Sequence, residues 1–391
     1  MALRSVRDLA VGGKRVLVRV DFNVPLRADG GVGDETRLRA SLPTVRLLLE
    51  RGAAVVLMSH LGRPEGKRDP RYGLAPVAAR FGELLGRPVG LAGDCVGPAA
   101  ETAARALRSG EVLLLENLRF HAGEEANEPE FARQLARLGD LYVNDAFGTA
   151  HRAHASTVGV ARHLPSAAGL LLAREVEALG GALERPRRPF VGVVGGSKIS
   201  SKIAVLDNLL PRVDRLLIGG AMAFTLLKAR GCRVGRSLVE DERLDLARQI
   251  IARGGEKLLL PVDAVAAAEL RPGEATAVVD ACAVPDDLRG LDVGPATIAA
   301  WAEALRGAGT VLWNGPLGAY EVPPFEAGTV ALGETLAASS ATTVVGGGDL
   351  VGALEAAGLA GRMSHVSTGG GASLEFIEGR VLPGIAALEE T

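Results

Sequence analysis

Two lysines lie four residues apart directly after a pair of glycines, in the segment GGSKISSK of residues 195–202. The chain has only six lysines, so this pair is a local concentration of a scarce side chain. Glycine after a strand lets the backbone approach a phosphate closely, and the free N–H groups at the start of the next helix bind the anion. Lys198 and Lys202 would share one helix face, where a polyphosphate between them removes their repulsion. The segment predicts a polyphosphate site; two solvated surface lysines are the alternative.

A single carboxylate follows three glycines in the segment GGGD, which ends at Asp349. Mg²⁺ usually takes one or two protein carboxylates together with phosphate oxygens, so Asp349 is a candidate magnesium ligand. The alternative is an aspartate that caps the next helix. The chain contains neither GxxxxGK[ST] nor GxGxxG. A standard P-loop and a dinucleotide fingerprint are therefore absent, which counts against an NAD-dependent dehydrogenase.

A second set of anion-binding side chains occupies the first half of the chain. Three arginines each follow a different apolar run, a fourth opens a helical stretch, and two histidines lie beside them: Arg63, Arg119, Arg152, Arg37, His60 and His151. Converging guanidinium groups bind phosphate or carboxylate with planar, bidentate donors. Asp21 and Asn23 could bind a hydroxyl group between two anionic ends. These residues predict a site for a small anion, although any one arginine could instead be solvated surface.

Ten short runs rich in Val, Leu and Ile must position these side chains. They cover residues 15–20, 53–58, 112–115, 141–143, 190–194, 215–218, 257–260, 310–313, 342–345 and 364–366, and helix-like stretches separate them. Continuous apolar runs fit strands buried on both faces, and strand–helix alternation predicts parallel sheets of the doubly wound α/β class. Ligands bind beyond the carboxyl ends of such strands. Arginine and histidine follow the first four runs and glycine-rich loops dominate from Val194 onward, so we expect two different binding edges.

Composition and charge restrict the class of protein. A chain of 391 residues with 48% hydrophobic residues suits two domains with real cores. The formal net charge of −2 argues against nucleic-acid or membrane partners. Three distant cysteines without a CxxC pair predict a reduced protein with neither a disulfide nor a structural zinc site. The first residues lack the apolar stretch of a signal peptide, so a cytoplasmic location is expected.

Nine segments, taken as a set, resemble the phosphoglycerate kinase family. In chain order they are RVLVRVDFNVPL, SHLGRP, ENLRFH, NDAFGTAHRAHAST, VVGGSKISSKI, GGAMAFT, WNGPLGAYE, VVGGGD and STGGGASLEFIEG. The resemblance implies two Rossmann-like doubly wound domains joined by a helix and hinge. The phosphoglycerate-binding domain would cover residues 1–172, the connecting helix and linker 173–188, and the nucleotide-binding domain 189–375. The tail of residues 376–391 would return to the first domain.

The same resemblance implies a role for individual residues. The substrate, 3-phosphoglycerate or 1,3-bisphosphoglycerate, would be bound by Asp21, Phe22, Asn23, Arg37, His60, Leu61, Gly62, Arg63, Arg119, His151 and Arg152. The nucleotide would be bound by Gly195, Gly196, Lys198, Lys202, Gly219, Gly220, Asn314, Glu321, Gly346, Gly347, Gly348, Asp349 and Leu350, with Glu321 at the ribose and Asp349 at Mg²⁺. The phosphoryl group in transfer would be stabilised by Arg37, Lys198, Lys202, Gly348 and Gly371.

The implied reaction is reversible, in-line phosphoryl transfer from 1,3-bisphosphoglycerate to ADP, with Mg²⁺ bound to the nucleotide, hinge closure and a monomeric enzyme. One residue departs from the family pattern: Ser or Thr usually follows GGGD, and here the residue is Leu350. That change removes one side-chain contact to a phosphate. A catalytically impaired relative that still binds phosphoglycerate and nucleotide is therefore the alternative.

Overall fold

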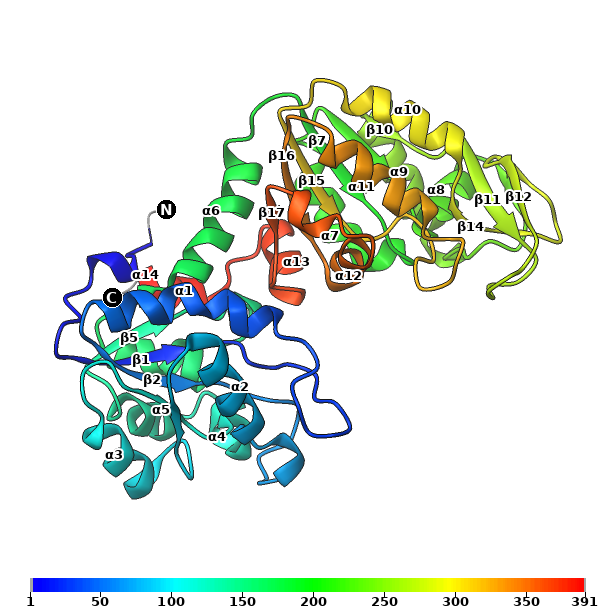
Figure 1. Ribbon diagram of the computed structural model, residues 1–391. Coiled ribbons are helices and arrows are strands. Elements are labelled where there is room, and N and C mark those ends of the chain that lie inside the picture. Colours follow the sequence, from blue (N-terminus) through cyan, green and yellow to red (C-terminus); the bar gives the residue numbers. More distant parts are fainter. Residues whose placement is uncertain (1–2, 390–391) are drawn as a thin grey trace. The chain divides into compact units, whose positions relative to one another are not determined.

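The structure is a computed structural model that describes residues 3–389. The chain divides into two compact units (Figure 1). Unit 1 comprises Met1–Glu177 and Val381–Thr391, and unit 2 comprises Ala178–Arg380. The division falls inside helix α6 (Leu170–Glu184), within the segment 173–188 for which the sequence predicts a connecting helix and linker.

Unit 1 is built on a six-stranded sheet in the order β3-β4-β2-β1-β5-β6, with every pair parallel. The strands are β1 (Arg15–Arg19), β2 (Ala54–Met58), β3 (Val89–Leu91), β4 (Val112–Leu114), β5 (Leu141–Asn144) and β6 (Ser166–Ala168). The helices are α1 (Thr36–Glu50), α2 (Ala75–Leu85), α3 (Gly97–Ala106), α4 (Ala122–Glu125), α5 (Pro129–Ala136) and α14 (Pro383–Glu389). The central strands are apolar on both faces because helices cover both, and Val16, Val18 and Leu57 are fully buried.

The C-terminal segment completes unit 1. The N–H of Gly384 donates to Ala150 O at 2.8 Å, and Asn144 Nδ2 donates to Gly384 O at 3.3 Å. A Cβ on Gly384 would lie 3.0 Å from the Cα of Ala150, so the backbone of α14 approaches the loop after β5 closely.

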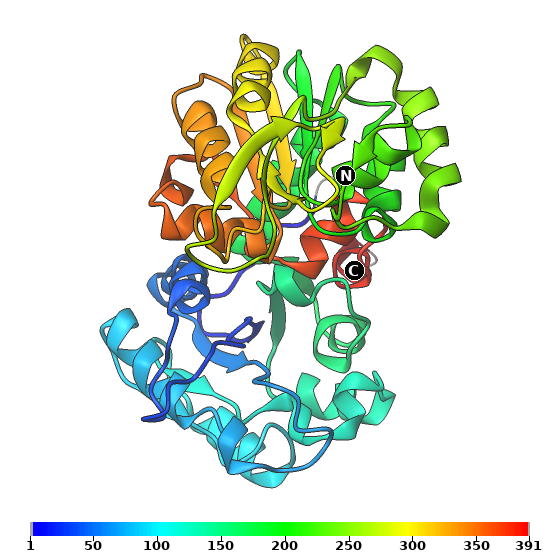
Figure 2. The ribbon, with the colours of Figure 1, turned by 90° about the vertical axis from the view of Figure 1, so that its right-hand side faces the viewer.

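Unit 2 repeats the architecture with a six-stranded parallel sheet in the order β10-β8-β7-β15-β16-β17. Its strands are β7 (Phe190–Val194), β8 (Arg215–Ile218), β10 (Leu258–Leu259), β15 (Thr310–Asn314), β16 (Thr342–Gly346) and β17 (His365–Val366). Its helices are α7 (Ile203–Leu209), α8 (Met222–Ala229), α9 (Leu244–Gly254), α10 (Pro295–Leu305), α11 (Ala327–Ala337), α12 (Gly348–Ala356) and α13 (Gly371–Ile377). They lie on both faces of the sheet (Figure 2). The predicted α/β class is confirmed, and all ten predicted strands are present.

Unit 2 also contains strands that the apolar runs do not predict. An antiparallel sheet has the order β12-β11-β14, formed by β11 (Asp263–Ala267), β12 (Thr276–Asp280) and β14 (Arg289–Val293). A second small sheet pairs β9 (Arg233–Val234) with β13 (Ala283–Val284) in parallel. Strand β12 is mostly exposed, so it lacks the continuous apolar run of a buried strand.

The prediction that the chain has no disulfide is wrong. Cys232 and Cys282 form one, with their Cα atoms 4.5 Å apart and a sequence separation of 50. Each cysteine directly precedes one strand of the β9–β13 pair, so the bond joins two segments that the sheet already holds together. Sequence spacing does not reveal this because the two segments meet only through tertiary structure. The third cysteine, Cys95, is a buried free thiol.

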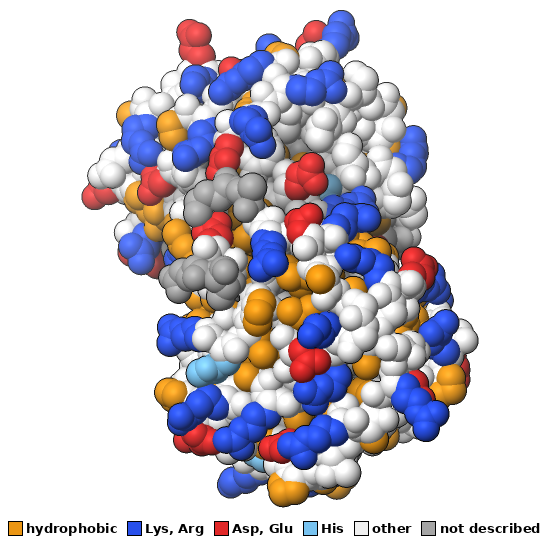
Figure 3. All heavy atoms as spheres, turned by 90° about the vertical axis from the view of Figure 1, so that its left-hand side faces the viewer, with side chains coloured by type: hydrophobic (Ala, Val, Ile, Leu, Met, Phe, Trp, Pro, Cys, Tyr) orange, Lys and Arg blue, Asp and Glu red, His pale blue; other side chains and the backbone are white. Residues whose placement is uncertain are grey.

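The surface agrees with the small net charge. On the face drawn in Figure 3, acidic and basic side chains are interspersed over both units without a continuous field of one sign. Among residues 3–389, no helix is both long enough and apolar enough to cross a bilayer.

Candidate functional site

The ends of three neighbouring strands of unit 2 enclose a pocket of about 170 Å³, here called the small pocket. Strands β7, β15 and β16 are adjacent in the sheet, so the loops that follow them meet at one edge. The pocket is lined by Gly195, Gly196, Ser197, Ser201, Lys202, Asn314, Gly315, Pro316, Gly347, Gly348, Asp349 and Leu350. Most of the residues that the sequence assigns to the nucleotide phosphates are thereby brought together.

Glycine is required at three positions in or beside this pocket. A Cβ on Gly195 would lie 2.0 Å from Pro316 O, and a Cβ on Gly220 would lie 2.5 Å from Gly196 O. Gly347 has a φ of 104°, which side-chain-bearing residues rarely adopt. The glycines therefore allow three loops to pack backbone against backbone, and they leave the pocket open to an anion.

Lys202 is the basic side chain inside the small pocket. Its Nζ donates to Asn314 Oδ1 at 2.5 Å, and Asn314 Nδ2 in turn donates to Gly346 O at 3.0 Å. Burial lowers the pKa of Lys202, and the carboxylates of Glu378 and Asp349 oppose that shift. The side chain is a half-buried ammonium donor that Asn314 holds at the mouth of the glycine loops.

The prediction that Lys198 and Lys202 share a helix face is wrong. Residues Ile199–Lys202 form a 3₁₀ helix and α7 begins only at Ile203, so Lys198 is extended, with φ −127° and ψ 128°. Ser200 fixes this tight turn, because its N–H and Oγ donate to Glu240 at 3.0 and 2.6 Å. Lys198 is exposed and does not line the small pocket.

Asp349 fits a cation site better than a helix cap. It lies in the first turn of α12, whose N-cap is Gly347, and it is exposed. Its carboxylate accepts no hydrogen bond within the described part of the chain, and it lines the small pocket. A hard oxygen donor beside a phosphate-sized cavity is the donor set that Mg²⁺ prefers when phosphate oxygens complete its shell. Residues of unit 2 therefore fit a magnesium–nucleotide complex, with Asp349 as the protein ligand.

The side chain of Leu350 is packed in the core of unit 2. It is fully buried and belongs to the hydrophobic core of unit 2, together with Leu354 and Trp313. Leu350 is also among the residues that line the small pocket. The side chain at this position contributes to packing rather than to anion binding.

A larger pocket of about 410 Å³ continues from the small one and shares Gly196, Ser197, Pro316 and Asp349 with it. Its other lining residues are Gly220, Ala221, Arg236, Leu238, Leu270, Arg289, Gly290, Leu291, Gly318, Ala319, Tyr320 and Glu321. The shared residues connect it to the glycine loops, and its three leucines provide an apolar lining that suits a flat aromatic base. The sequence predicts Gly196, Gly220, Glu321 and Asp349 as site residues. It does not predict the three leucines, because they do not lie in a glycine-rich segment at the end of a strand.

Three glycines assigned from the resemblance lie outside both pockets. Gly219 is packed so closely that a Cβ would lie 2.7 Å from Leu317 Cδ2. Gly346 is buried at the end of β16, where its carbonyl accepts from Asn314. Gly371 opens helix α13 at an exposed position. Their predicted contacts to the nucleotide or to the phosphoryl group stay predictions.

In unit 1, the loops after β1 and β2 meet the start of α1 through polar contacts. Arg37 Nη1 donates to Asp21 Oδ2 at 2.9 Å and to Asn23 O at 3.1 Å. Asn23 Oδ1 accepts from the N–H of Gly62 at 2.9 Å. Arg37 is only partly buried, so its remaining N–H groups can reach a ligand while Asp21 fixes its position.

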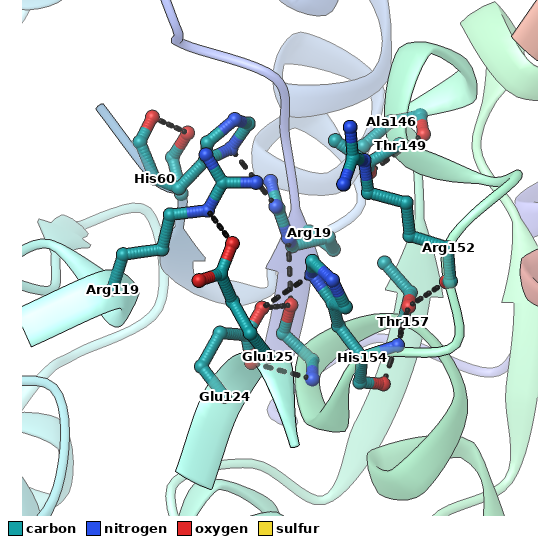
Figure 4. Close-up of polar contacts among 12 residues, drawn as sticks. Arg19, His60, Arg119, Glu124, Glu125, Ala146, Thr149, Arg152, His154 and Thr157 are labelled. Atoms are coloured by element: carbon teal, nitrogen blue, oxygen red, sulfur yellow. Dashed lines mark hydrogen bonds and ion pairs between the residues drawn. The ribbon is translucent and has the colours of Figure 1, made fainter. Parts of the chain in front are cut away.

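Arg119 and His60 lie close together (Figure 4). Arg119 Nη1 donates to Gly62 O at 2.8 Å, and its Nε lies 3.1 Å from Glu125 Oε1. Burial lowers the pKa of Arg119, and the positive charges of Arg19 and Arg152 lower it further. The carboxylate of Glu125 opposes this shift. Burial and neighbouring arginines also hold the pKa of His60 well below its usual value. Several positive charges held this near to one another favour an anionic partner.

The remaining predicted residues of unit 1 are distributed differently. The side chains of Phe22 and Leu61 are buried in the core, and their N–H groups donate to Ser59 Oγ and Asn117 Oδ1. Arg63 and Arg152 are exposed, and His151 is partly buried. The positive charge of Arg152 lowers the pKa of both Arg119 and His154, which places it near the cluster.

A separate group of metal-binding residue types lies where the loop after β3 meets the residue that precedes α4. Ligand atoms of Asp94, Cys95 and His121 lie within 4.8 Å of one another. Asp94 Oδ1 already accepts from the N–H of Cys95 at 2.6 Å and lies 2.7 Å from His121 Nε2. Burial raises the pKa of the Cys95 thiol well above its usual value. These contacts satisfy the group without an ion.

Comparisons with known proteins cover the whole chain. Residues 6–380 match the family model described as Phosphoglycerate kinase. Similar curated proteins include phosphoglycerate kinases of Moorella thermoacetica, 57% identical over 100% of both chains, and of Pelotomaculum thermopropionicum, 54% identical over 99% of both. The solved phosphoglycerate kinase of Coxiella burnetii has a TM-score of 0.91 and 44% identity over 100% of this chain and 99% of that one. The Pyrococcus horikoshii enzyme has a TM-score of 0.86 and 34% identity, covering 99% and 98%. The chain belongs to the phosphoglycerate kinase family.

Proposed function

We propose that this chain is the enzyme that transfers a phosphoryl group reversibly from 1,3-bisphosphoglycerate to ADP, giving 3-phosphoglycerate and ATP. The observation that carries the proposal is the continuous site of unit 2, in which a glycine-walled pocket with Lys202 and Asp349 opens into a longer pocket with an apolar end. That sequence of surfaces matches a nucleoside di- or triphosphate from its terminal phosphate to its base. The family membership supplies the second substrate.

The phosphoglycerate is assigned to the basic cluster of unit 1. Arg37, Arg119 and His60 are directional donors that bind the stationary phosphate and carboxylate ends, and Asp21 or Asn23 can bind the hydroxyl group between them. An acyl phosphate is already activated, so the reaction needs no nucleophilic side chain. Positioning and neutralisation of charge supply the catalysis.

Lys202 is assigned to the phosphoryl group in transfer. Its ammonium group is half-buried and held by Asn314 beside the glycine loops, so it can stabilise charge that develops on the transferring oxygens. The N–H groups of Gly348 and Leu350 at the start of α12 add fixed partial positive charge. Bound Mg²⁺ would supply further neutralisation of the nucleotide phosphates, held by Asp349. We assign Lys198, Arg37 and Gly371 supporting roles at the same group.

The two substrates are assigned to different units, so transfer requires that they meet with water excluded. We propose that hinge closure brings this about. We also propose that the active species is a cytoplasmic monomer that takes its nucleotide as the magnesium complex. The alternative of an impaired relative depended on Leu350, and the burial of that side chain leaves no observation in its favour.

A coupled assay tests the function directly. The chain is mixed with 3-phosphoglycerate, Mg·ATP and glyceraldehyde-3-phosphate dehydrogenase, and the loss of NADH is followed. We expect turnover of about 1–100 s⁻¹ or faster, abolished by a chelator and strongly reduced in Lys202→Ala. Lys228→Ala is the matched control, because Lys228 is an exposed lysine of unit 2 paired with Asp241. The absence of turnover in a folded chain that binds both ligands by calorimetry would refute the proposal.

A further inference from the structure

A chain of buried polar side chains runs behind the basic cluster of unit 1, and only one of its members, His60, has a binding role in the function proposed above. Its members are Arg19, His60, Glu124, His154 and Ser156, which are between 0% and 7% exposed. They come from β1, the loop after β2, helix α4 and the segment 154–159. Figure 4 shows how Arg19, His60, Glu124 and His154 converge. Burying a charged side chain is costly unless each polar atom is paired, so this arrangement requires an explanation.

Glu124 and Ser156 form the fixed end of the chain. Glu124 Oε1 accepts from Ser156 Oγ at 2.6 Å, and Glu124 Oε2 accepts from the N–H of Ser156 at 2.9 Å. Ser156 has one hydroxyl proton, and the hydroxyl group uses it in the hydrogen bond to Glu124. The serine oxygen is therefore left as an acceptor, and the Nε of Arg19 donates to it at 2.8 Å.

Arg19 is held at three of its nitrogens. Its Nε donates to Ser156 Oγ, its Nη1 donates to Val20 O, and its Nη2 lies 3.1 Å from His60 Nδ1. A guanidinium group has donors but no acceptor. His60 Nδ1 must therefore offer its lone pair to Arg19, and in the neutral ring the proton then resides on Nε2.

The surroundings of His60 keep the ring neutral. The charged and titratable groups that face it are Arg19, Arg119, Arg37 and His154, all cationic or capable of becoming so. Together with burial they hold its pKa well below the usual value. Glu124 faces Arg19, Arg119 and, at 3.8 Å, His154 Nδ1.

We propose that Arg19 is a positioning residue that fixes His60 as the Nε2–H tautomer, and that Glu124, acting through Ser156, holds Arg19 in place. His60 then gives the anionic substrate one neutral hydrogen bond that does not depend on pH near neutrality. The proposal rests on the proposed function only for the identity of the anion, since the tautomer follows from the contacts of unit 1 alone.

The tautomer is measured by ¹H–¹⁵N NMR of the histidine side chains, with His60 assigned by its loss in His60→Gln. In the wild-type chain we expect a neutral Nε2–H ring that does not titrate between pH 6 and pH 8. Ser156→Ala removes the relay to Arg19, and we expect a mixed tautomer and an increase in the KM for 3-phosphoglycerate of about tenfold. The KM for ATP should not change. Glu124→Gln should shift both quantities in the same direction.

Ser166→Ala is the matched control, because Ser166 is a fully buried serine of unit 1 whose Oγ donates only to backbone carbonyls. It should leave the His60 tautomer and the KM for 3-phosphoglycerate as they are. If Ser156→Ala does not fold, Arg19→Lys is the second variant. The single side-chain nitrogen of lysine cannot take the place of the three separate nitrogens through which Arg19 contacts Ser156, Val20 and His60. A wild-type Nδ1–H ring, or an unchanged tautomer in the folded variants, would overturn the proposal. Failure of the proposed function alone would leave the tautomer intact and abolish turnover in the wild-type chain.

Discussion

Reduction of the Cys232–Cys282 disulfide is expected to destabilise unit 2 and leave unit 1 unchanged. The bond closes a loop of 50 residues. In the chain-entropy description, a cross-link of that length stabilises the folded state by about 4 kcal/mol, because it removes conformations from the unfolded chain. Cys282 is exposed and Cys232 partly so, and a dithiol reductant can therefore reach the bond in the folded protein.

The chain provides its own reporter for this measurement. Both tryptophans, Trp301 and Trp313, are buried in unit 2, so their fluorescence follows the unfolding of that unit alone. We expect dithiothreitol to lower the free energy of unfolding in guanidinium chloride by about 4 kcal/mol. The double variant Cys232→Ser/Cys282→Ser is the control, and its transition should lie at the reduced position with or without reductant.

Two results would refute this reasoning. Thiol titration of the unfolded, untreated chain should detect one free thiol, that of Cys95, and a count of three would contradict the pairing. An unchanged tryptophan transition after complete reduction would contradict the loop-entropy argument.

Loss of the disulfide is also expected to affect nucleotide binding, because two hydrogen bonds join the segments just beyond it. Arg236 N donates to Leu288 O, and Ser237 Oγ accepts from Gly290 N. Those two segments line the larger pocket, so weaker ADP binding should accompany reduction.

Four further outcomes are expected. Lys202→Ala should lower kcat about a hundred- to thousandfold without weakening 3-phosphoglycerate binding in calorimetry, and near-normal kcat would remove Lys202 from the mechanism. Leu350→Ser should lower the free energy of unfolding of unit 2 by about 3 kcal/mol or more, measured by tryptophan fluorescence; a variant of undiminished stability and higher kcat would show that the side chain does not belong to the core. Burial raises the pKa of Asp145 to about 7 from a model-compound value of 3.8, so its stabilising contribution is complete below about pH 4 and is lost as the pH rises through about 7. Asp145→Asn keeps an acceptor for the N–H groups of Leu171 and Leu172 and should flatten that loss in thermal unfolding between pH 5 and pH 8, whereas equal slopes would argue against Asp145 as its source. Both substrates together should reduce the radius of gyration more than either alone, and identical scattering curves would contradict hinge closure.

Much of the fold is visible in the sequence because the central strands are buried on both faces. Runs such as 190–194 and 310–313 are almost entirely apolar, with Thr310 as the one polar residue, and they become the adjacent strands β7 and β15. The antiparallel sheet is different. Its strand β12 is exposed and its neighbour β11 is largely alanine, so neither shows the pattern on which the prediction depends.

The residues of the candidate site also fall into two groups, those that the sequence predicts and those that it does not. Residues at or just beyond the carboxyl end of a strand, such as Asp21, His60 and Asn314, could be found because parallel strands carry their ligands at one edge. Residues that support them from elsewhere could not. Glu124 lies in a four-residue helix with no distinguishing motif, and Arg19 lies inside an apolar run. A charged residue within a strand that is otherwise wholly buried was the one available signal, since such a charge must have a partner.

The lysine pair shows how local geometry decides between residues that spacing makes equivalent. A four-residue separation places two side chains on one face only if the helix between them is an α-helix. The turn here is 3₁₀ and begins after Lys198, so Lys202 enters the glycine-walled pocket and Lys198 stays exposed. A charge that stabilises a transition state must lie where water is excluded, because its effect falls steeply in a high dielectric. Of the two lysines, Lys202 alone meets that condition in unit 2, and the larger loss of kcat should follow its removal.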